Sequence, residues 1–128
     1  MKVISTEKAP AAIGPYSQAI MVDGVLFTSG QIPLNPATGS VAGSDIETQT
    51  EQVMRNLSAV LKEAGMDFEN VVKTTCFIAN MEYFSAFNQI YSKYFVSKPA
   101  RSCVEVSRLP KNVLVEVELI AKNKKQEE

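Results

Sequence analysis

Short runs of apolar residues, broken by glycine and proline, recur along the chain and are typical of β-strands joined by turns. Two of these runs, residues 18–22 and 25–29, flank Asp23-Gly24, a pair that favours a tight type I′ turn. The pattern therefore predicts a β-hairpin at this point. Further strands are predicted at Val3-Ile4 and at residues 71–79, 101–107 and 113–122.

Two longer segments have apolar residues at helical spacing. Ser44 and Glu47 match a capping box at the start of the first, and Gly65 is placed to end it. The second spans about residues 82–95 and carries a row of aromatic side chains, which we interpret as core. The apolar face of the first helix contains Ile46, Val53, Leu57, Val60, Leu61 and Ala64. The aromatic row of the second contains Phe84, Phe87, Tyr91, Tyr94 and Phe95.

The order of these elements predicts a single α+β domain over residues 1–128, with a mixed sheet and both helices packed on one face. The charged end of the chain, residues 123–128, is expected to be disordered. Two helices cover only one side of a sheet, yet the strand at 71–79 has apolar residues on both sides. We therefore expect a homo-oligomer that buries the second face and has clefts between subunits.

Composition excludes several classes of protein. The 128 residues include 13 basic and 14 acidic side chains, a net charge of -1, which argues against a nucleic-acid or polybasic membrane partner. Histidine is absent, which removes the usual Ser-His-Asp and Cys-His nucleophile systems and nearly all zinc enzymes. No signal-like or membrane-spanning apolar run is present, so a cytoplasmic location is expected.

Arg101 and Glu116 are the charged residues most suited to a site. Arg101 opens a strand, where a guanidinium can bind a carboxylate through two parallel hydrogen bonds, although an ion pair with Glu116 or Glu118 explains the pattern as well and is the commoner case. Glu116 has apolar neighbours, which favour a proton-handling role through desolvation. A solvated strand face is the alternative for both glutamates, and we prefer it for Glu118.

The two cysteines, Cys76 and Cys103, lie far apart in strand-like segments and are expected to be free thiols. No histidine is available to activate Cys103, so a packing or backbone role is favoured, and Cys76 is interpreted as core. Asn88 interrupts the aromatic row, either as a packing amide or as a site contact. Two loop ends, at residues 14–17 and 28–31, could offer backbone amides to an anion.

Together these features resemble the reactive intermediate deaminase A family, also called RidA or YjgF-like. The most specific match is Pro99-Ala100-Arg101-Ser102-Cys103-Val104-Glu105-Val106, and it is accompanied by residues 9–19, 28–33, 72–77, 109–110 and 115–118. The resemblance implies a chorismate-mutase-like α+β fold that forms a homotrimer with three intersubunit clefts. It also implies that the last strand is inserted between earlier strands.

The resemblance further implies hydrolytic deamination of reactive enamines and imines, namely 2-aminoacrylate/2-iminopropanoate and 2-iminobutanoate, to 2-keto acids and ammonia. Arg101 would bind the substrate carboxylate, and Glu116 would position or activate the attacking water. Gly30 and Cys103 would complete the pocket through their main chain, with Tyr16, Ser29 and Asn88 as its lining. The expected partners are a small imino or keto acid and two further copies of the chain, without a metal or other cofactor.

Two other functions remain open at this point. The first is a non-catalytic regulatory protein that binds small carboxylates in the same clefts. The second is a translation inhibitor with ribonuclease activity, which the absence of histidine and of a basic stripe makes weaker.

Overall fold

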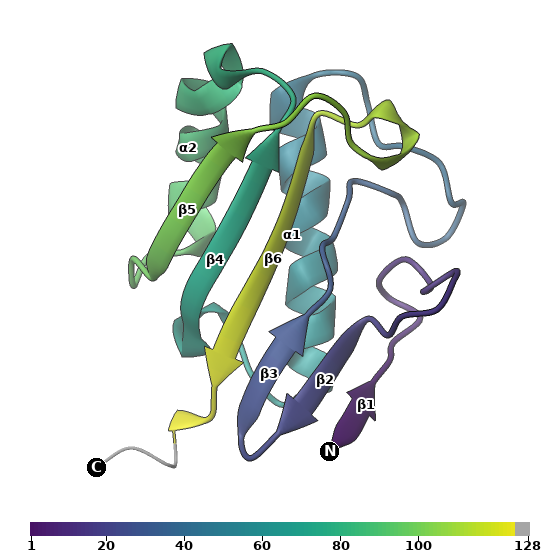
Figure 1. Ribbon diagram of the computed structural model, residues 1–128, viewed down its shortest axis with the longest axis vertical. Helices are drawn as coiled ribbons and strands as arrows, with labels where there is room; N and C mark the ends of the chain where they lie inside the picture. The colour runs from purple at the N-terminus through teal and green to yellow at the C-terminus, as the bar shows by residue number, and fades with distance from the viewer. Residues whose placement is uncertain (125–128) are drawn as a thin grey trace.

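The computed structural model describes residues 1–124, which form a six-stranded mixed sheet covered on one face by two α-helices. Figure 1 shows α1 and α2 on the same side of the sheet, which confirms the predicted layers. No helix among the described residues is long and apolar enough to cross a membrane. The elements are β1 (Lys2–Ile4), β2 (Ala19–Val22), β3 (Val25–Thr28), α1 (Ile46–Glu63), the short 3-10 helix η1 (Phe68–Asn70), β4 (Val71–Ile78), η2 (Met81–Tyr83), α2 (Phe84–Tyr94), β5 (Ala100–Glu105), η3 (Pro110–Asn112) and β6 (Val115–Lys122).

The predicted hairpin is confirmed as β2 and β3. Asp23 and Gly24 both have positive φ, 51° and 77°, which the type I′ turn requires and which aspartate and glycine adopt at low cost. The strands pair from Ala19 with Thr28 to Val22 with Val25.

The start of α1 differs from the prediction by one residue. Asp45, not Ser44, is the N-cap: it has extended backbone angles, and its carboxylate accepts a hydrogen bond from the Thr48 amide at 2.8 Å. The buried Ile46 is the first helical residue, so Ser44 lies one position too early to cap the helix. The predicted end is confirmed, because Gly65 has a φ of 76° and follows the last turn.

β6 lies between β3 and β4, so the sheet order is β1-β2-β3-β6-β4-β5 (Figure 1). This confirms the inserted last strand that the family resemblance implied. β6 runs antiparallel to both neighbours, whereas β4 and β5 are parallel. The chain therefore does not pair β5 and β6 as a hairpin, although the two strands follow one another in the sequence.

Alternate residues of β4 and β6 face the helices and form the core. Thr74, Cys76 and Ile78 of β4 are fully buried, as is Val117 of β6. The alternation of buried and exposed residues is broken at the start of β4. A bulge at Val71/Lys73 places Val71 in the core and leaves the side chain of Val72 47% exposed. Strict alternation along residues 71–79 predicts that Val72 lies on the same face as Cys76 and Ile78, and this prediction is wrong at this end of the strand.

The opposite face of the sheet is not covered by any described part of the chain. Phe27 is 44% exposed, and Val104 is 42% exposed. Between them lie the half-buried side chains of Phe77 and Ile120, on β4 and β6. These apolar side chains share the open face with charged ones, among them Glu116 and Glu118, and the subunit contact expected there stays a prediction.

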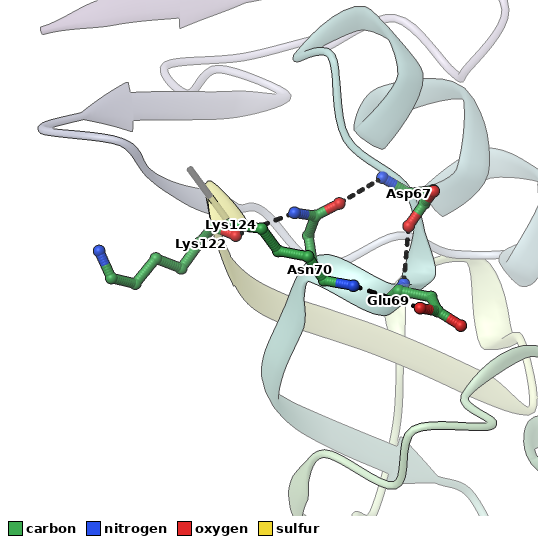
Figure 2. A network of polar contacts seen from close by, with 5 residues as sticks. All are labelled: Asp67, Glu69, Asn70, Lys122 and Lys124. Atoms are coloured by element: carbon green, nitrogen blue, oxygen red, sulfur yellow. Dashed lines mark hydrogen bonds and ion pairs between the residues drawn. The ribbon is translucent and has the colours of Figure 1, made fainter. Parts of the chain in front are cut away.

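A polar network ties the end of β6 to η1 (Figure 2). The Asn70 side chain donates to the Lys122 carbonyl at 3.0 Å and accepts from the Asp67 amide at 3.0 Å. Asp67 in turn accepts from the Glu69 amide, and Glu69 forms a 3.2 Å ion pair with Lys124. The network holds the last strand against the turn that precedes β4.

The tail at residues 123–128 was predicted to be disordered. Its first residue is placed by a hydrogen bond from the Asn123 amide to the Gly24 carbonyl, at 2.8 Å. Residues 125–128 lie outside the described part of the chain.

Candidate functional site

The residues that the sequence singled out fall into two groups. Tyr16, Ser29, Gly30 and Glu116 surround a hollow of about 310 Å³, together with Ile32 and Pro110, which the sequence analysis had not proposed. Asn88, Arg101 and Cys103 form the second group, at the contact between α2 and the edge strand β5.

The first group depends on a contact between Gly30 and Glu116. Gln31 and Val117 exchange backbone hydrogen bonds of 2.9 and 3.2 Å, which place the chain after β3 directly beside β6. A methyl group on Gly30 would lie 2.7 Å from Cδ and 2.9 Å from Cγ of Glu116, and closer still to Oε2. Only glycine therefore leaves room for the carboxylate at this position.

Ser29 fixes the loop on the other side of the hollow. Its hydroxyl donates to the Ser17 carbonyl at 2.6 Å, and its amide donates to the Gln18 carbonyl at 2.9 Å. The buried Gln18 side chain is bonded to main-chain atoms of residues 6, 9 and 10. These bonds shape the loop that carries Tyr16, whose side chain is 53% exposed at the rim.

Glu116 is half-buried, and its surroundings disfavour its charge. Burial raises the pKa of the Glu116 carboxyl above its ordinary value, and the nearby charge of Glu118 raises it further. Burial is thus the main influence on this carboxyl, and the proton-handling role of Glu116 stays a prediction. A carboxylate with a raised pKa is a stronger base than one in water, once it has lost its proton.

Arg101 anchors the second group. Its Nη1 donates to Oδ1 of Asn88 at 2.7 Å, and its guanidinium lies 4.8 Å from the centre of the Tyr91 ring and 5.4 Å from that of Phe84. Such contacts hold the planar group by cation–π attraction. Tyr91 is itself fixed by a 2.7 Å hydrogen bond between its hydroxyl and that of buried Thr74.

The ion-pair interpretation of Arg101 is wrong for the described residues. The ion pair found among residues 1–124 joins Lys124 and Glu69, and neither Glu116 nor Glu118 lies within 4.0 Å of the guanidinium. The contacts of Arg101 are thus one amide oxygen and two aromatic rings, and residues 1–124 supply no counterion for its positive charge. A half-buried guanidinium in this state is suited to binding an anion.

Cys103 contributes a polarised thiol beside Arg101. It pairs in register with Cys76 of β4, and both cysteines are free. The neighbouring Cys76 thiol lowers the pKa of Cys103 to about 7 against the opposing effect of burial, and the charge of Arg101 also lowers it. The same interaction raises the pKa of Cys76, which is also fully buried. Cys103 is therefore the more acidic of the two thiols, and its packing or backbone role stays a prediction.

The two groups lie on opposite faces of the sheet. Arg101 pairs with Thr74, whose side chain is buried under the helices, and the guanidinium contacts α2. Glu116 pairs with Phe77, and both belong to the face that the helices leave open. Since neighbouring residues in register point to the same side of a sheet, one chain does not bring Arg101 and Glu116 together.

Comparison with known proteins places this arrangement in a family. The family model described as Endoribonuclease L-PSP matches residues 6–123. AldR of Lactococcus lactis, named as a candidate regulator, is 62% identical over 97% of this chain and 99% of its own. The mouse 2-iminobutanoate/2-iminopropanoate deaminase is 50% identical over 94% of this chain and 90% of its own.

A solved structure agrees with the sequence matches. E. coli TdcF with bound serine superimposes with a TM-score of 0.92 at 39% identity, covering 96% of this chain and 99% of that one. The fold, its strand order and the motif around Arg101 therefore have one explanation: the chain belongs to the endoribonuclease L-PSP family, which includes the reactive intermediate deaminase A proteins.

Proposed function

We propose that the protein hydrolyses small 2-imino acids, such as 2-iminopropanoate and 2-iminobutanoate, to 2-keto acids and ammonia. The observation that carries this proposal is the guanidinium of Arg101, which is held by two rings and an amide and has no counterion within the described part of the chain. It offers free N–H groups to the carboxylate that every such substrate carries.

The proposal requires the group around Glu116 and the group around Arg101 to come from neighbouring chains. A homotrimer with the chorismate-mutase-like arrangement would bring them together. The open sheet face of one chain, with Glu116 and the hollow beside Gly30, would pack against the edge that carries Arg101 in the next chain. The apolar residues exposed on that face, such as Phe27 and Val104, support such a contact. Light scattering should then give a mass of about 42 kDa, three times the 14.0 kDa of one chain.

The chemistry needs few groups. Arg101 orients the substrate by its carboxylate, and ionised Glu116 removes a proton from water as the water oxygen attacks C2 of the imine. The imine nitrogen gains protons, first to give a carbinolamine and then an ammonium leaving group. The C–N bond breaks as the carbon–oxygen double bond forms, so ammonia leaves and the keto acid remains. These steps use no histidine and no covalent nucleophile.

The test measures keto acid release while a serine or threonine dehydratase generates the imine in place. The Arg101→Ala variant should lose about 10- to 150-fold in kcat/KM, since a charged hydrogen bond contributes about 1.5–3 kcal/mol. Lys93→Ala removes a positive charge from the exposed side of α2 and should leave the rate unchanged. A wild-type protein that does not accelerate imine loss over the spontaneous rate would refute the proposal.

A second candidate function is binding without turnover. The relative AldR is named as a candidate regulator, and the TdcF structure contains serine, a small carboxylate. Titration calorimetry with a 2-keto acid distinguishes the two functions. Binding that requires Arg101 and persists in Glu116→Ala, with no turnover in any form, would favour the regulator.

The family description also names a ribonuclease. This activity is tested by incubating RNA with the purified wild-type protein and with Arg101→Ala.

A further inference from the structure

The two cysteines lie side by side in the sheet, although 26 residues separate them in the sequence. Cys76 of β4 and Cys103 of β5 are direct partners in the parallel pairing of these strands. Both side chains therefore point to the helix face, and adjacent strands are about 4.8 Å apart. Cα atoms at this separation fall within the range that a disulfide can bridge, about 4.4–6.8 Å.

The two thiols differ in access and in charge. Cys76 is completely buried between the sheet and the helices, where its Sγ lies 3.9 Å from Oγ1 of Thr74. Cys103 is only half-buried, on the edge strand, and lies two positions from Arg101, whose guanidinium has no carboxylate partner among residues 1–124. The neighbouring Cys76 thiol and the charge of Arg101 both favour a thiolate at Cys103 and, against the effect of its partial burial, lower its pKa to about 7. Cys103 is thus the nucleophile of the pair, and Cys76 is the neighbouring thiol.

We propose that Cys103 and Cys76 form a reversible oxidation site for hydroperoxides, with Cys103 as the attacking sulfur and Cys76 as the resolving one. In the first step the Cys103 thiolate attacks one oxygen of hydrogen peroxide. The O–O bond breaks, hydroxide leaves, and Cys103 becomes a sulfenic acid. In the second step the Cys76 sulfur attacks the Cys103 sulfur, which forms the disulfide and releases water. The two thiols lose two electrons, and the peroxide is reduced to two water molecules once the thiol protons are counted.

A disulfide between Cys76 and Cys103 would change the position of Arg101. β5 is an edge strand that pairs only with β4 in the described sheet, so it can shift toward Cys76. A disulfide needs its Cβ atoms about 3.5–4.5 Å apart, closer than two strands normally bring them, which strains the bond and keeps it reducible. The shift would move Arg101, two residues from Cys103, away from the geometry set by Asn88 and Tyr91. This effect on activity rests on the proposed function, whereas the oxidation itself does not.

Mass spectrometry of the intact chain tests the oxidation. The wild-type protein is treated with hydrogen peroxide, the excess is removed with catalase, and the unfolded chain is alkylated with iodoacetamide. We expect a mass about 2 Da below that of the reduced chain, no alkylation, and recovery of two alkylated thiols after dithiothreitol. Cys76→Val should instead collect one or two oxygen atoms on Cys103, and Cys103→Ser should not react, since its remaining thiol is buried.

Three results would overturn the proposal. They are oxygen added to Cys103 of the wild type while Cys76 remains free for alkylation, a disulfide between two chains, and no reaction at all.

Activity is measured on the same samples. Oxidation should lower kcat/KM about 10- to 100-fold, with recovery on reduction, because small misplacements of a binding group cost this much. An active enzyme that forms the disulfide without losing rate would refute the link to Arg101. A reduced protein without deaminase activity would refute the proposed function, and the mass would still decide the disulfide.

Discussion

The placement of Arg101 and Glu116 on opposite faces of the sheet predicts that two inactive variants restore each other. Arg101→Ala removes the proposed carboxylate-binding group, and Glu116→Gln removes the proposed base. If every cleft takes Arg101 from one chain and Glu116 from the next, a mixed oligomer contains some clefts in which both residues are intact. The two variants co-expressed in equal amounts should therefore be active, although each alone is not.

The expected magnitude follows from random assembly. One half of the chains supplies an intact Arg101, and one half supplies an intact Glu116, so about one quarter of the clefts should be complete. A single-chain site would give none, because no chain carries both residues. A second mixture combines wild type with the double variant that carries both Arg101→Ala and Glu116→Gln. About one quarter of its clefts are complete if the site is shared between chains, and about one half if the site lies within one chain.

The assay is keto acid release per total chain, at saturating imine supply, with the ratio of the two chains measured by mass spectrometry. Wild type alone sets the full rate, and each variant alone sets the background. Equal rates for the two mixtures, near one quarter of the wild-type rate, are the expected result. A first mixture that stays at background while the second reaches one half would refute the shared cleft and the proposed subunit contact.

Three further predictions concern stability. Glu116→Gln should raise Tm by about 2 °C at pH 8 and by less at pH 4, measured by differential scanning fluorimetry. Burial raises the folded pKa of Glu116, so its ionisation cost sets in as the pH rises above the unfolded pKa and is complete above the folded pKa; an equal rise at both pH values would contradict this. Asp45→Ala should lower Tm by roughly 4 °C, whereas Ser44→Ala should not change it, and the reverse order would show that Ser44 is the cap. Tyr91→Phe removes the hydroxyl bonded to Thr74 and should cost about 1 kcal/mol in urea unfolding. Because the ring below Arg101 remains, KM should stay within about twofold, and a larger change in KM would mean that the hydroxyl, not the ring, holds the guanidinium.

The local pattern predicts most elements of the fold because each depends on a few neighbouring residues. Asp23-Gly24 specifies its turn through backbone angles that those two residues favour, and Gly65 ends α1 in the same way. The first residue of α1 was less certain from the pattern, since Ser44 and Asp45 are both good caps. Burial of Ile46 decides between them, and burial is a property of the packed structure. The phase change at Val72 is likewise invisible in an alternating pattern, because a bulge inserts one residue without a sequence signal.

The candidate site could likewise be predicted from the sequence only in part. The identities of Arg101 and Glu116 could be taken from their motif and their neighbours, but their separation by the sheet requires the strand order. The aromatic row of α2 was interpreted as core, which holds for buried Phe87, while Phe84 and Tyr91 also form the support of the guanidinium. A helical period identifies a buried face but not the charged group at its border.

The sequence also does not predict that Cys76 and Cys103 are neighbours. It indicates a core role for one and a packing or backbone role for the other, because nothing in their spacing shows that they are register partners. The pairing depends on the parallel alignment of β4 and β5, which the connection through α2 sets.

The insertion of β6 into the middle of the sheet has a consequence for how the protein is made. Before β6 leaves the ribosome, the nascent chain contains two separate pieces of sheet, β1-β2-β3 and β4-β5, with unpaired edges at β3 and β4. β6 joins them through contacts as distant as Val25 with Lys122, so the central sheet closes only after nearly all of the chain has been synthesised. A translation product that stops before β6 keeps both edges open to other strands, and such products are natural substrates for chaperones and proteases.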